Sequence, residues 1–576
     1  MTRAGISFDT RLAISVVSLV LGFGILLVIL HGAQPLATVG SALNPASFET
    51  VRKCRYLVVI RGAVEQPGTI SLRSASGEPI SLETALPPPV GEPDAPVWKI
   101  VRARARARDV VVFVQGTTRP EIQVRKIDER APRRKWIATT IFLIGVACFC
   151  VFHRRRKWVQ AFALGVAYFL FLLPWHKPAF FSATGDNQFY VPTGMSLLER
   201  GDWNVDEFGG PTPAVSFKAD YSVRQGKDGH YYNLFPPGST IVALPMIALG
   251  SWLTDQIPDP VERARGIAEL AAKVISAATI ALFYLVLTSL TPRRGLSYIL
   301  LGVFALATPQ LATHGGGLWS HNASTFLSVL ALCFWIWKDG KDAALAAVPL
   351  ALGMACRPTM LLPTAVFASA LLLRDRKKFA AFAVLVLAGL GLFVLHSLGM
   401  WGELLPPYYT GHATAPGSAA SAFLGTLVSP NRGLFVYCPV LLFATVGGVS
   451  AWRRGGPLIF RMAGAVVVLE WIVASHNRLW WGGHCYGPRL LCEAVPFGVL
   501  LLIPAWETIE RLRYRRAFLI LGMIASGWGF FVQLQALRSP EVYQWNARPN
   551  VDLHPERLWD WSDWQILAAY QKPRPN

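Results

Sequence analysis

The feature that most constrains this fold is an alternation of long apolar segments with short basic clusters. A helix of about 20 apolar residues crosses the hydrocarbon core of a bilayer. Thirteen segments meet or approach this length, namely 12–30, 136–152, 158–174, 268–290, 296–312, 322–337, 343–356, 359–373, 379–397, 434–451, 458–475, 496–510 and 517–536. We therefore predict an all-α polytopic membrane bundle of about 13 transmembrane helices.

The basic clusters fix the predicted orientation of this bundle. From His153 onward they fall in every second connection, at His153–Lys157, Arg293–Arg294, Arg374–Lys378, Arg453–Arg454 and Arg511–Arg516. Lys and Arg accumulate in cytoplasmic loops of membrane proteins. We therefore place the N-terminus in the cytoplasm and the C-terminus outside it.

The composition supports a membrane protein and excludes a nucleic-acid partner. The chain has 576 residues, of which 53% are hydrophobic and 16% are charged, whereas soluble domains carry about a quarter charged residues. The net charge of +20 comes largely from the loop clusters. No soluble basic domain is present to bind a nucleic acid.

Two apolar segments are interpreted from their flanks. The first, in residues 1–31, follows basic residues and lacks a small-residue cleavage site, so we predict an uncleaved transmembrane helix. The second, Phe235–Asp255, is apolar enough to span. Counting it as a span would place Arg293–Arg294 outside and invert every later loop. We interpret it as an amphipathic or re-entrant helix on the outer surface.

Residues 32–135 are predicted to form an inserted, small extracytoplasmic domain that resembles a β-sandwich. Its short runs rich in Val and Ile are separated by Gly and Pro, as strands are. Within it, the run VRARARAR would place four arginines on one face of a strand, namely Arg102, Arg104, Arg106 and Arg108. This stripe is either a solvated face or a surface for anionic lipid headgroups or an anionic glycan.

The remaining chain divides into three further regions. Residues 136–157 hold the second predicted transmembrane helix and a basic cytoplasmic loop, and residues 158–536 form the helical core. The tail 537–576 is predicted to lie outside. The outer loops, together with this tail, carry nine of the eleven histidines, and loops on a rigid scaffold commonly carry function. We therefore expect any chemistry on the outer face.

Asp186 lies in the longest outer loop, 175–267. It follows the predicted span 158–174 closely, and Gly185 permits a tight turn that aims the carboxylate toward the bundle. The alternative is that Asp186 only caps the helix that the next residues can form.

Arg357 is the most unusual of the predicted outer-face cations. The apolar stretch 343–373 is too short for two full spans, so the turn at Arg357–Pro358 should lie below the membrane surface in a protein cavity. A cation inside a membrane is a functional candidate. The alternative is a structural arginine that pairs with a loop carboxylate or with helix carbonyl groups.

The outer loop His476–Pro496 is dense in polar and aromatic residues. Gly482–Gly483 allows close backbone approach, so that His484, Tyr486 and Arg489 can point toward one site. Trp481 can line this site or lie at the membrane interface. Arg489 can also form a plain ion pair with Glu493 four residues later.

Several of these motifs together resemble the membrane glycosyltransferases of the GT-C fold. They are the GD acid at Asp186, YYNLFPPG (Tyr231–Gly238), the W-S-H turn at Trp319, the C-R-P turn at Arg357, SPNRGLFVY and WWGGHCYGPRLL. The GT-C families include the lipid A aminoarabinose transferases and the protein O-mannosyltransferases. The resemblance covers about residues 158–536 and leaves out the first helix and the β-rich region.

The resemblance implies an inverting glycosyltransferase of a bacterial cytoplasmic (inner) membrane. The donor would be a polyprenyl-phosphate sugar, and the acceptor an extracytoplasmic lipid, glycan or protein. Asp186 would be the catalytic base or would orient the acceptor. Relatives often carry a second acid where this chain has Asn187, which favours a metal-independent mechanism with no cofactor.

The implied substrate contacts complete the predicted site. The donor phosphate would be bound by cations of the outer face, namely Arg357, Arg489, Lys218 and His484. The substrate groove would be lined by Tyr231, Tyr232, Pro236, Pro237, Trp481 and Tyr486.

Two other functions fit parts of this pattern. A transporter or flippase would place ionisable residues at mid-membrane. The centres of the predicted spans carry almost none, and Glu470 and Arg461 are the main exceptions. A ligase or polymerase of surface polysaccharide would also use large outer loops with paired arginines. It would, however, concentrate its basic residues in later loops.

Overall fold

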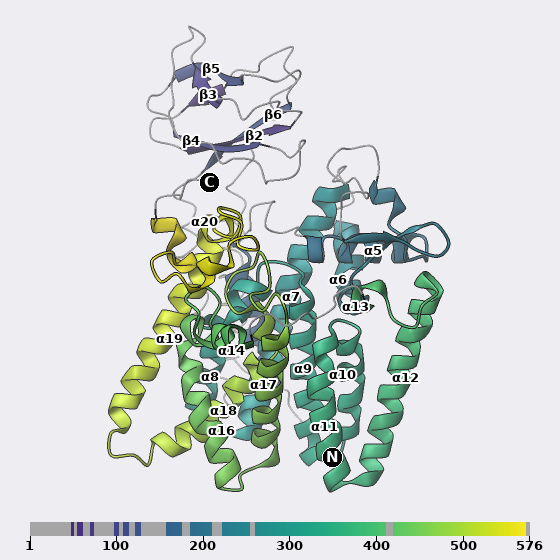
Figure 1. Cartoon of the computed structure of the whole chain (residues 1–576), viewed down its shortest axis with the longest axis vertical. Coiled ribbons are helices and arrows are strands. Elements are labelled where there is room, and N and C mark those ends of the chain that lie inside the picture. The colour runs from purple at the N-terminus through teal and green to yellow at the C-terminus, as the bar shows by residue number, and fades with distance from the viewer. Residues whose placement is uncertain are drawn as a thin grey trace, which may run out of the picture. The chain divides into compact units, whose positions relative to one another are not determined.

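The structure, a computed structural model, describes residues 157–175, 185–209, 222–253, 260–410 and 419–571, together with six strands between residues 48 and 127. Contacts divide these elements into two compact units. One holds the six strands, and the other holds the described helices and a short hairpin (Figure 1). The predicted helices 12–30 and 136–152 lie outside the described residues.

The six strands of the first unit form two antiparallel sheets of three strands each. The strands are β1 (Phe48–Thr50), β2 (Arg55–Arg61), β3 (Ile70–Arg73), β4 (Val97–Arg102), β5 (Ala107–Val114) and β6 (Glu121–Ile127). The strand orders are β1-β5-β3 and β4-β2-β6. Strands β2 to β6 coincide with the predicted Val- and Ile-rich runs, whereas β1 lies outside them. A separate domain facing outward stays a prediction.

The four arginines of the predicted stripe do not lie on one described strand. Arg102 ends β4 and pairs with Arg55 of β2, whereas Arg108 belongs to β5 in the other sheet. Arg104 and Arg106 lie outside the described residues. The run of alternating Arg and Ala therefore begins in one sheet, at Arg102, and ends in the other, at Arg108.

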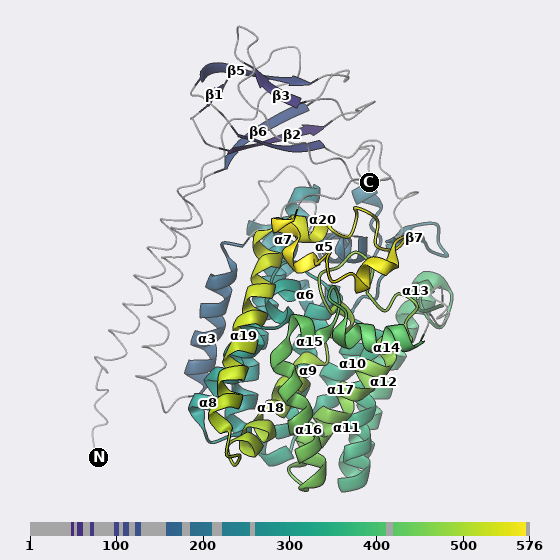
Figure 2. The ribbon, with the colours of Figure 1, turned by 60° about the vertical axis from the view of Figure 1, so that its left-hand side comes forward.

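The second unit is a bundle of helices, several of them apolar (Figure 2). Four are long and apolar enough to cross a membrane, namely α7 (Pro260–Leu290, from Arg263), α12 (Arg376–Trp401), α17 (Leu458–His476) and α19 (Arg515–Arg538). Shorter apolar helices are α3 (Lys157–Leu172), α6 (Gly238–Leu253), α8 (Arg294–Leu306), α9 (Ser320–Ile336), α10 (Ala347–Met354), α11 (Leu361–Arg374) and α18 (Val495–Ile509). The chain is thus a helical membrane protein, and the count of thirteen spans stays a prediction.

Several predicted spans are shorter as helices because prolines interrupt them. The span 296–312 stops at the end of α8, before Pro309 begins a single π turn (Gln310–His314). The span 434–451 is broken at Pro439 into α15 (Leu434–Tyr437) and α16 (Leu442–Arg453). Proline lacks the N–H that an inner helical turn requires.

Two elements within the predicted loops are also regular. Residues Ala419–Val428 form helix α14, and Val223–Gln225 and Tyr231–Asn233 pair as the antiparallel hairpin of β7 and β8. The segment Phe235–Asp255 contains α6, as expected of a helix. Its position at a membrane surface stays a prediction.

The basic turns of the bundle gather at one end. Arg293, after α7, lies 2.5 Å from Glu510 at the end of α18, and Arg454, after α16, donates to Thr508 of α18 at 3.3 Å. The α11–α12 turn lies at the same end, and the short helices α5 (Tyr190–Glu199) and α20 (Glu541–Gln544) lie at the other (Figure 1). This sidedness matches the alternation in the sequence. The assignment of the basic end to the cytoplasm remains a prediction.

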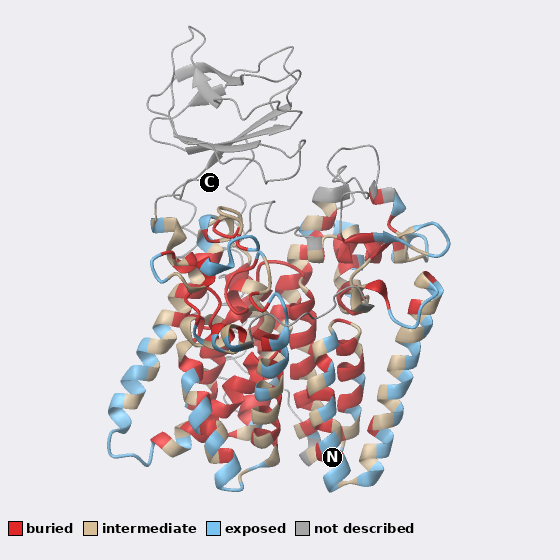
Figure 3. Cartoon of the chain, viewed as in Figure 1, coloured by how far each residue is buried: buried red, intermediate tan, exposed pale blue. Residues whose placement is uncertain are grey.

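Burial separates the inner helices from the outer ones. Most residues of α18 are buried (Figure 3). In the most apolar stretches of α12 and α19, by contrast, only 6% and 17% of the residues are buried. The exposed residues of α12 include Val384, Leu387 and Leu392. Exposed apolar surface of this extent suits contact with lipid.

The packing of α16 against α18 depends on one glycine. A Cβ at Gly447 would overlap with the Leu501 carbonyl oxygen of α18. Small residues allow such close approach between membrane helices. The neighbouring Gly448 differs, because a Cβ there would lie 3.8 Å from Leu501 Cδ1.

We predict that Gly447→Ala destabilises the protein by about 1–3 kcal/mol, because overpacking pushes the two helices apart. Gly448→Ala is the matched control. It should be neutral or stabilise by up to about 1 kcal/mol, since alanine favours helix formation over glycine. Thermal unfolding of both variants in the same detergent measures this difference. Equal melting temperatures would contradict the role of Gly447.

Candidate active site

Five charged or imidazole side chains from distant parts of the chain meet in one cluster, here called the arginine–carboxylate cluster. Its members are Asp186, His321, Arg357, Arg489 and Glu493. Asp186 lies in the short turn Gly185–Asn187, His321 in the first turn of α9 and Arg357 between α10 and α11. Arg489 and Glu493 come from the loop that leads into α18. Four separate elements therefore build the cluster.

Arg489 is held on three sides. Its Nη2 donates to the Asp186 carboxylate, and its Nε donates to His321 Nε2 at 3.0 Å. Its guanidinium lies 4.5 Å from the centre of the Trp319 ring, a cation–π distance. The guanidinium plane is therefore fixed, and Asp186 is its most exposed partner.

Glu493 is the hub on the buried side of the cluster. Its Oε1 accepts from Ser324 at 2.8 Å and lies 2.9 Å from His321 Nδ1 and from Arg357 Nε. Arg357 also donates to Ser320 Oγ at 3.0 Å. One carboxylate oxygen thus binds one arginine directly and reaches the other through His321.

The hydrogen bonds assign the protonation state of His321. An arginine N–H always donates, so His321 Nε2 must be the acceptor of the bond from Arg489. The single proton of a neutral imidazole then lies on Nδ1, from which it donates to Glu493. His321 is therefore a neutral spacer between Arg489 and Glu493.

The cluster keeps Glu493 ionised despite its burial. Burial alone raises the pKa of a carboxyl group. Here the nearby Arg357 guanidinium, with hydrogen bonds from the neutral His321 and from Ser324, holds the pKa of Glu493 well below its usual value. Two arginines therefore face two carboxylates, and the five residues carry no net charge together.

The aromatic and proline residues beside Arg357 form a wall next to the cluster. Gly238, the residue after Pro236–Pro237, donates its N–H to the Ala355 carbonyl group at 2.7 Å, two residues before Arg357. The ring of Phe235 lies 5.2 Å from that of Tyr408. The chain that follows Pro236–Pro237 therefore packs against the turn that carries Arg357, while a substrate groove lined by these prolines stays a prediction.

Asp186 does not cap the following helix. The residue at the N-cap of α5 is Phe189, with no side-chain cap hydrogen bond.

Asn187 packs near Gly317: a Cβ added at Gly317 would lie 3.3 Å from Asn187 Nδ2. In the described part of the chain, no three His, Cys, Asp or Glu side chains lie close enough to hold a metal ion.

The structure shows which carboxylates pair with Arg357 and Arg489. Arg357 does pair with a loop carboxylate, Glu493, so the structural reading of that residue holds in part. The alternative for Arg489 was a plain ion pair with Glu493; in the structure its carboxylate partner is Asp186. Both arginines belong to the same cluster.

The other two predicted phosphate-binding residues are not among the described members of the cluster. Lys218 lies outside the described residues. His484 Nε2 donates to Asn550 Oδ1 at 3.0 Å and lies 3.5 Å from Asp552, so the structure places His484 against the C-terminal tail. A role for His484 at the Asp186 site has no support from this placement.

The predicted groove residues Tyr231 and Tyr232 belong to the β7–β8 hairpin. The Tyr231 N–H donates to Asp206 at 2.8 Å, and the Tyr232 hydroxyl donates to Asp228 at 2.6 Å. The Tyr232 ring packs 5.8 Å from Trp401 at the end of α12. These contacts stabilise the hairpin and do not reach the arginine–carboxylate cluster.

Trp481 and Tyr486 are buried against the tail and α19. Trp481 Nε1 donates to Asp552 at 2.7 Å, and the Tyr486 hydroxyl donates to the Val532 carbonyl group at 2.7 Å. Gly482 and Gly483 between them have positive φ angles of 73° and 68°. These glycines let the chain turn, which glycine does without strain.

A second buried arginine, Arg432, joins this loop to the tail. It is 1% exposed, and each of its five N–H groups has an acceptor. The acceptors are the carbonyl groups of Trp481 (2.8 Å), Asn431 (2.6 Å) and Gly483 (3.2 Å), Gln565 Oε1 (2.7 Å) and Asn546 Oδ1 (2.6 Å). With its donors satisfied, Arg432 has a structural role.

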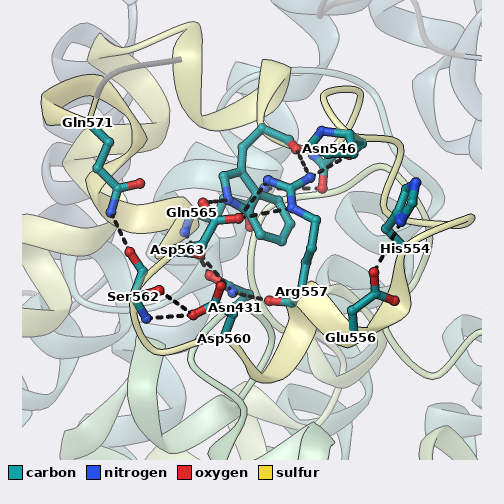
Figure 4. Close-up of polar contacts among 12 residues, drawn as sticks. Asn431, Asn546, His554, Glu556, Arg557, Asp560, Ser562, Asp563, Gln565 and Gln571 are labelled. Carbon is teal, nitrogen blue, oxygen red and sulfur yellow. Dashed lines mark hydrogen bonds and ion pairs between the residues drawn. The ribbon is translucent and has the colours of Figure 1, made fainter. Parts of the chain in front are cut away.

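The tail carries its own buried ion pair. Arg557 Nε and Nη2 each lie 2.9 Å from Asp563 Oδ2, and the Arg557 guanidinium stacks 4.0 Å from the Trp545 ring centre. Asn431 donates to the carbonyl groups of Arg557 at 2.8 Å and Asp563 at 3.1 Å (Figure 4). The tail is therefore an integral layer of the bundle.

Two members of the cluster were not among the predicted site residues. His321 stood only in the W-S-H turn, and Glu493 only as a possible partner of Arg489. His321 lies 172 residues before Glu493 and 168 residues before Arg489, so no local sequence pattern connects them. The usable signal is a polar residue at the start of an otherwise apolar helix.

Comparison with known proteins gives only weak structural similarity. No family model and no curated protein matches the chain. Among solved structures, the chain is similar to the arabinosyltransferase EmbB from Mycobacterium smegmatis, solved by single-particle cryo-EM, with 12% identity and a TM-score of 0.33. The similarity covers 91% of this chain and 60% of that chain. This chain thus spans less than two thirds of the length of EmbB.

We predict that Arg432→Met destabilises the protein by about 3 kcal/mol or more, because several buried acceptors lose their donor at once. The tail should also become sensitive to trypsin. Arg513→Met, on the exposed turn before α19, is the matched control and should change neither property. Thermal unfolding and limited trypsin digestion measure both. A fully protected tail in Arg432→Met would contradict the role of Arg432.

Proposed function

We propose that the chain is a GT-C-type glycosyltransferase that moves a sugar from a polyprenyl-phosphate donor to an extracytoplasmic acceptor. The observation that carries this proposal is the arginine–carboxylate cluster. It holds two arginines and a partly exposed Asp in a membrane bundle. Arginine pairs with phosphate oxygens in the same bidentate geometry as with carboxylates.

The two arginines suit the leaving group of such a reaction. Transfer breaks the bond between the sugar C1 and the phosphate oxygen, and the departing phosphate gains negative charge. Fixed cations in a site that excludes water stabilise such charge, each by several kcal/mol. Arg489, fixed by His321 and Trp319, meets this requirement without reorganising.

Asp186 suits the acceptor side. A carboxylate can take the proton of an attacking hydroxyl or amine group when it lies within hydrogen-bonding reach. Asp186 is the most exposed member of the cluster, at 24% of its side chain. It comes from a different loop than the arginines, so it can face the acceptor while Arg357 and Arg489 face the phosphate.

The proline and aromatic wall suits the prenyl chain. Pro236–Pro237 and the apolar helix α6 lie next to Arg357, where an isoprenoid attached to the bound phosphate needs an apolar surface. Phe235 and Tyr408 extend this wall with their packed rings. The sugar and the acceptor stay unassigned.

We predict that Asp186→Asn lowers transfer by about 10²–10⁴-fold, the usual contribution of a general base. One polyprenyl-phosphate sugar should then accumulate in cells that carry the variant, and one glycan should be lost. Mass spectrometry of the lipid fraction identifies both.

Asp202→Asn is the matched control for this experiment. Asp202 lies in the same loop and pairs with Arg200 on the surface, at 3.0 Å. This variant should leave the lipid pool unchanged. Identical lipid pools in wild type and Asp186→Asn, with both proteins folded and abundant, would rule out Asp186 as the base and favour a transporter.

We predict that Arg489→Lys lowers transfer by about 10–10³-fold although it keeps the charge. Lysine lacks the planar fork that contacts Asp186, His321 and Trp319 at once. Arg224→Lys, on the exposed edge of the β7–β8 hairpin, is the control and should retain full activity. Glycan content per unit of membrane-inserted protein measures the effect, and full activity in Arg489→Lys would contradict this role.

A further inference from the structure

The Asp186–Arg489 pair forms the accessible edge of the arginine–carboxylate cluster. Asp186 and Arg489 are 24% and 14% exposed at their side chains, whereas His321 and Glu493 are 0% and 1% exposed. Arg357, at 12%, is nearly as exposed as Arg489, so a ligand can reach both arginines beside Asp186. One of these two cations, Arg489, is already paired with the Asp186 carboxylate.

Arg489 itself cannot leave its position easily. Its Nε is bonded to His321, and its face rests on Trp319. His321 is in turn bonded to Glu493, which also binds Arg357. An incoming anion that binds at the Nη2 edge of Arg489 must therefore replace Asp186 there rather than move the arginine.

The charge balance points the same way. The five residues hold two positive and two negative charges, so an added phosphate makes the site net negative. Two anions that compete for one guanidinium repel each other in a buried site. The electrostatic repulsion is smallest when the Asp186–Arg489 ion pair breaks and the phosphate takes the place of Asp186.

We propose that the donor phosphate displaces Asp186 from Arg489, so that donor binding itself frees the carboxylate which accepts the acceptor's proton. This inference rests on the proposed function. While Asp186 is paired, its oxygen accepts from a guanidinium and is a poor base. The acceptor therefore binds productively only after the donor.

The chemical step balances without a further reactant. The acceptor oxygen or nitrogen forms a bond to the sugar C1, and its proton moves to Asp186. The bond from C1 to the phosphate oxygen breaks, and its electron pair stays on that oxygen beside Arg489 and Arg357. The protonated Asp186 then no longer competes with the phosphate for Arg489.

The test measures binding of farnesyl phosphate, a short polyprenyl phosphate, to the full-length protein in nanodiscs. Asp186→Asn removes the internal competitor and should bind it about tenfold more tightly than wild type. Asp202→Asn should bind it as wild type does. Farnesol, which has the same chain without the phosphate, should bind all three proteins equally.

Asp186→Ser provides a second variant without the charge, in case Asp186→Asn does not fold. If both variants bind farnesyl phosphate no more tightly than wild type does, and wild type does bind it, then the displacement of Asp186 by phosphate is wrong. The proposed function is not contradicted by that result. Tighter binding of farnesol as well would also overturn it, because the effect would then not come from the phosphate. A wild-type protein that binds no polyprenyl phosphate and transfers no sugar overturns the proposed function itself.

Discussion

The arrangement of the candidate site depends on the carboxylate of Glu493. Its Oε1 accepts a hydrogen bond from the Ser324 hydroxyl group and lies beside both His321 and Arg357. Without it, Arg357 would be a buried charge without a counter-ion, a state that costs several kcal/mol. Through His321 the same oxygen also orients Arg489. One buried anion thus fixes the spacing of two cations that come from separate parts of the chain.

The sequence predicts the class of fold from physical rules that act locally. Apolar length and basic turns indicate a helical membrane bundle, and contacts such as Arg293 with Glu510 gather those turns at one end. Helix lengths are less predictable. Pro309 and Pro439 end helices inside apolar runs that look continuous by composition. The Arg–Ala alternation likewise hides a change of sheet, because period-two patterns do not record where a strand ends.

The candidate site is predictable only where one residue is unusual by itself. Asp186, Arg357 and Arg489 are charged groups in conspicuous places, and the structure brings them into one cluster. His321 and Glu493 look ordinary in the sequence, because their role arises from contacts across more than 160 residues. His484 and Trp481 show the opposite error. They are conspicuous residues, but their partners are Asn550 and Asp552 in the tail.

The docking of the tail has a consequence for biosynthesis. Two of the acceptors of Arg432, Asn546 and Gln565, lie near the end of the chain. A nascent chain that has inserted its helices but not yet delivered these residues holds Arg432 with part of its hydrogen bonds unmade. The loop Trp480–Tyr486, which leads into Arg489, then lacks its covering layer. This end of the bundle is therefore completed only after residue 565 has been synthesised, and a chain truncated before residue 546 presents an incomplete surface to membrane quality-control proteases.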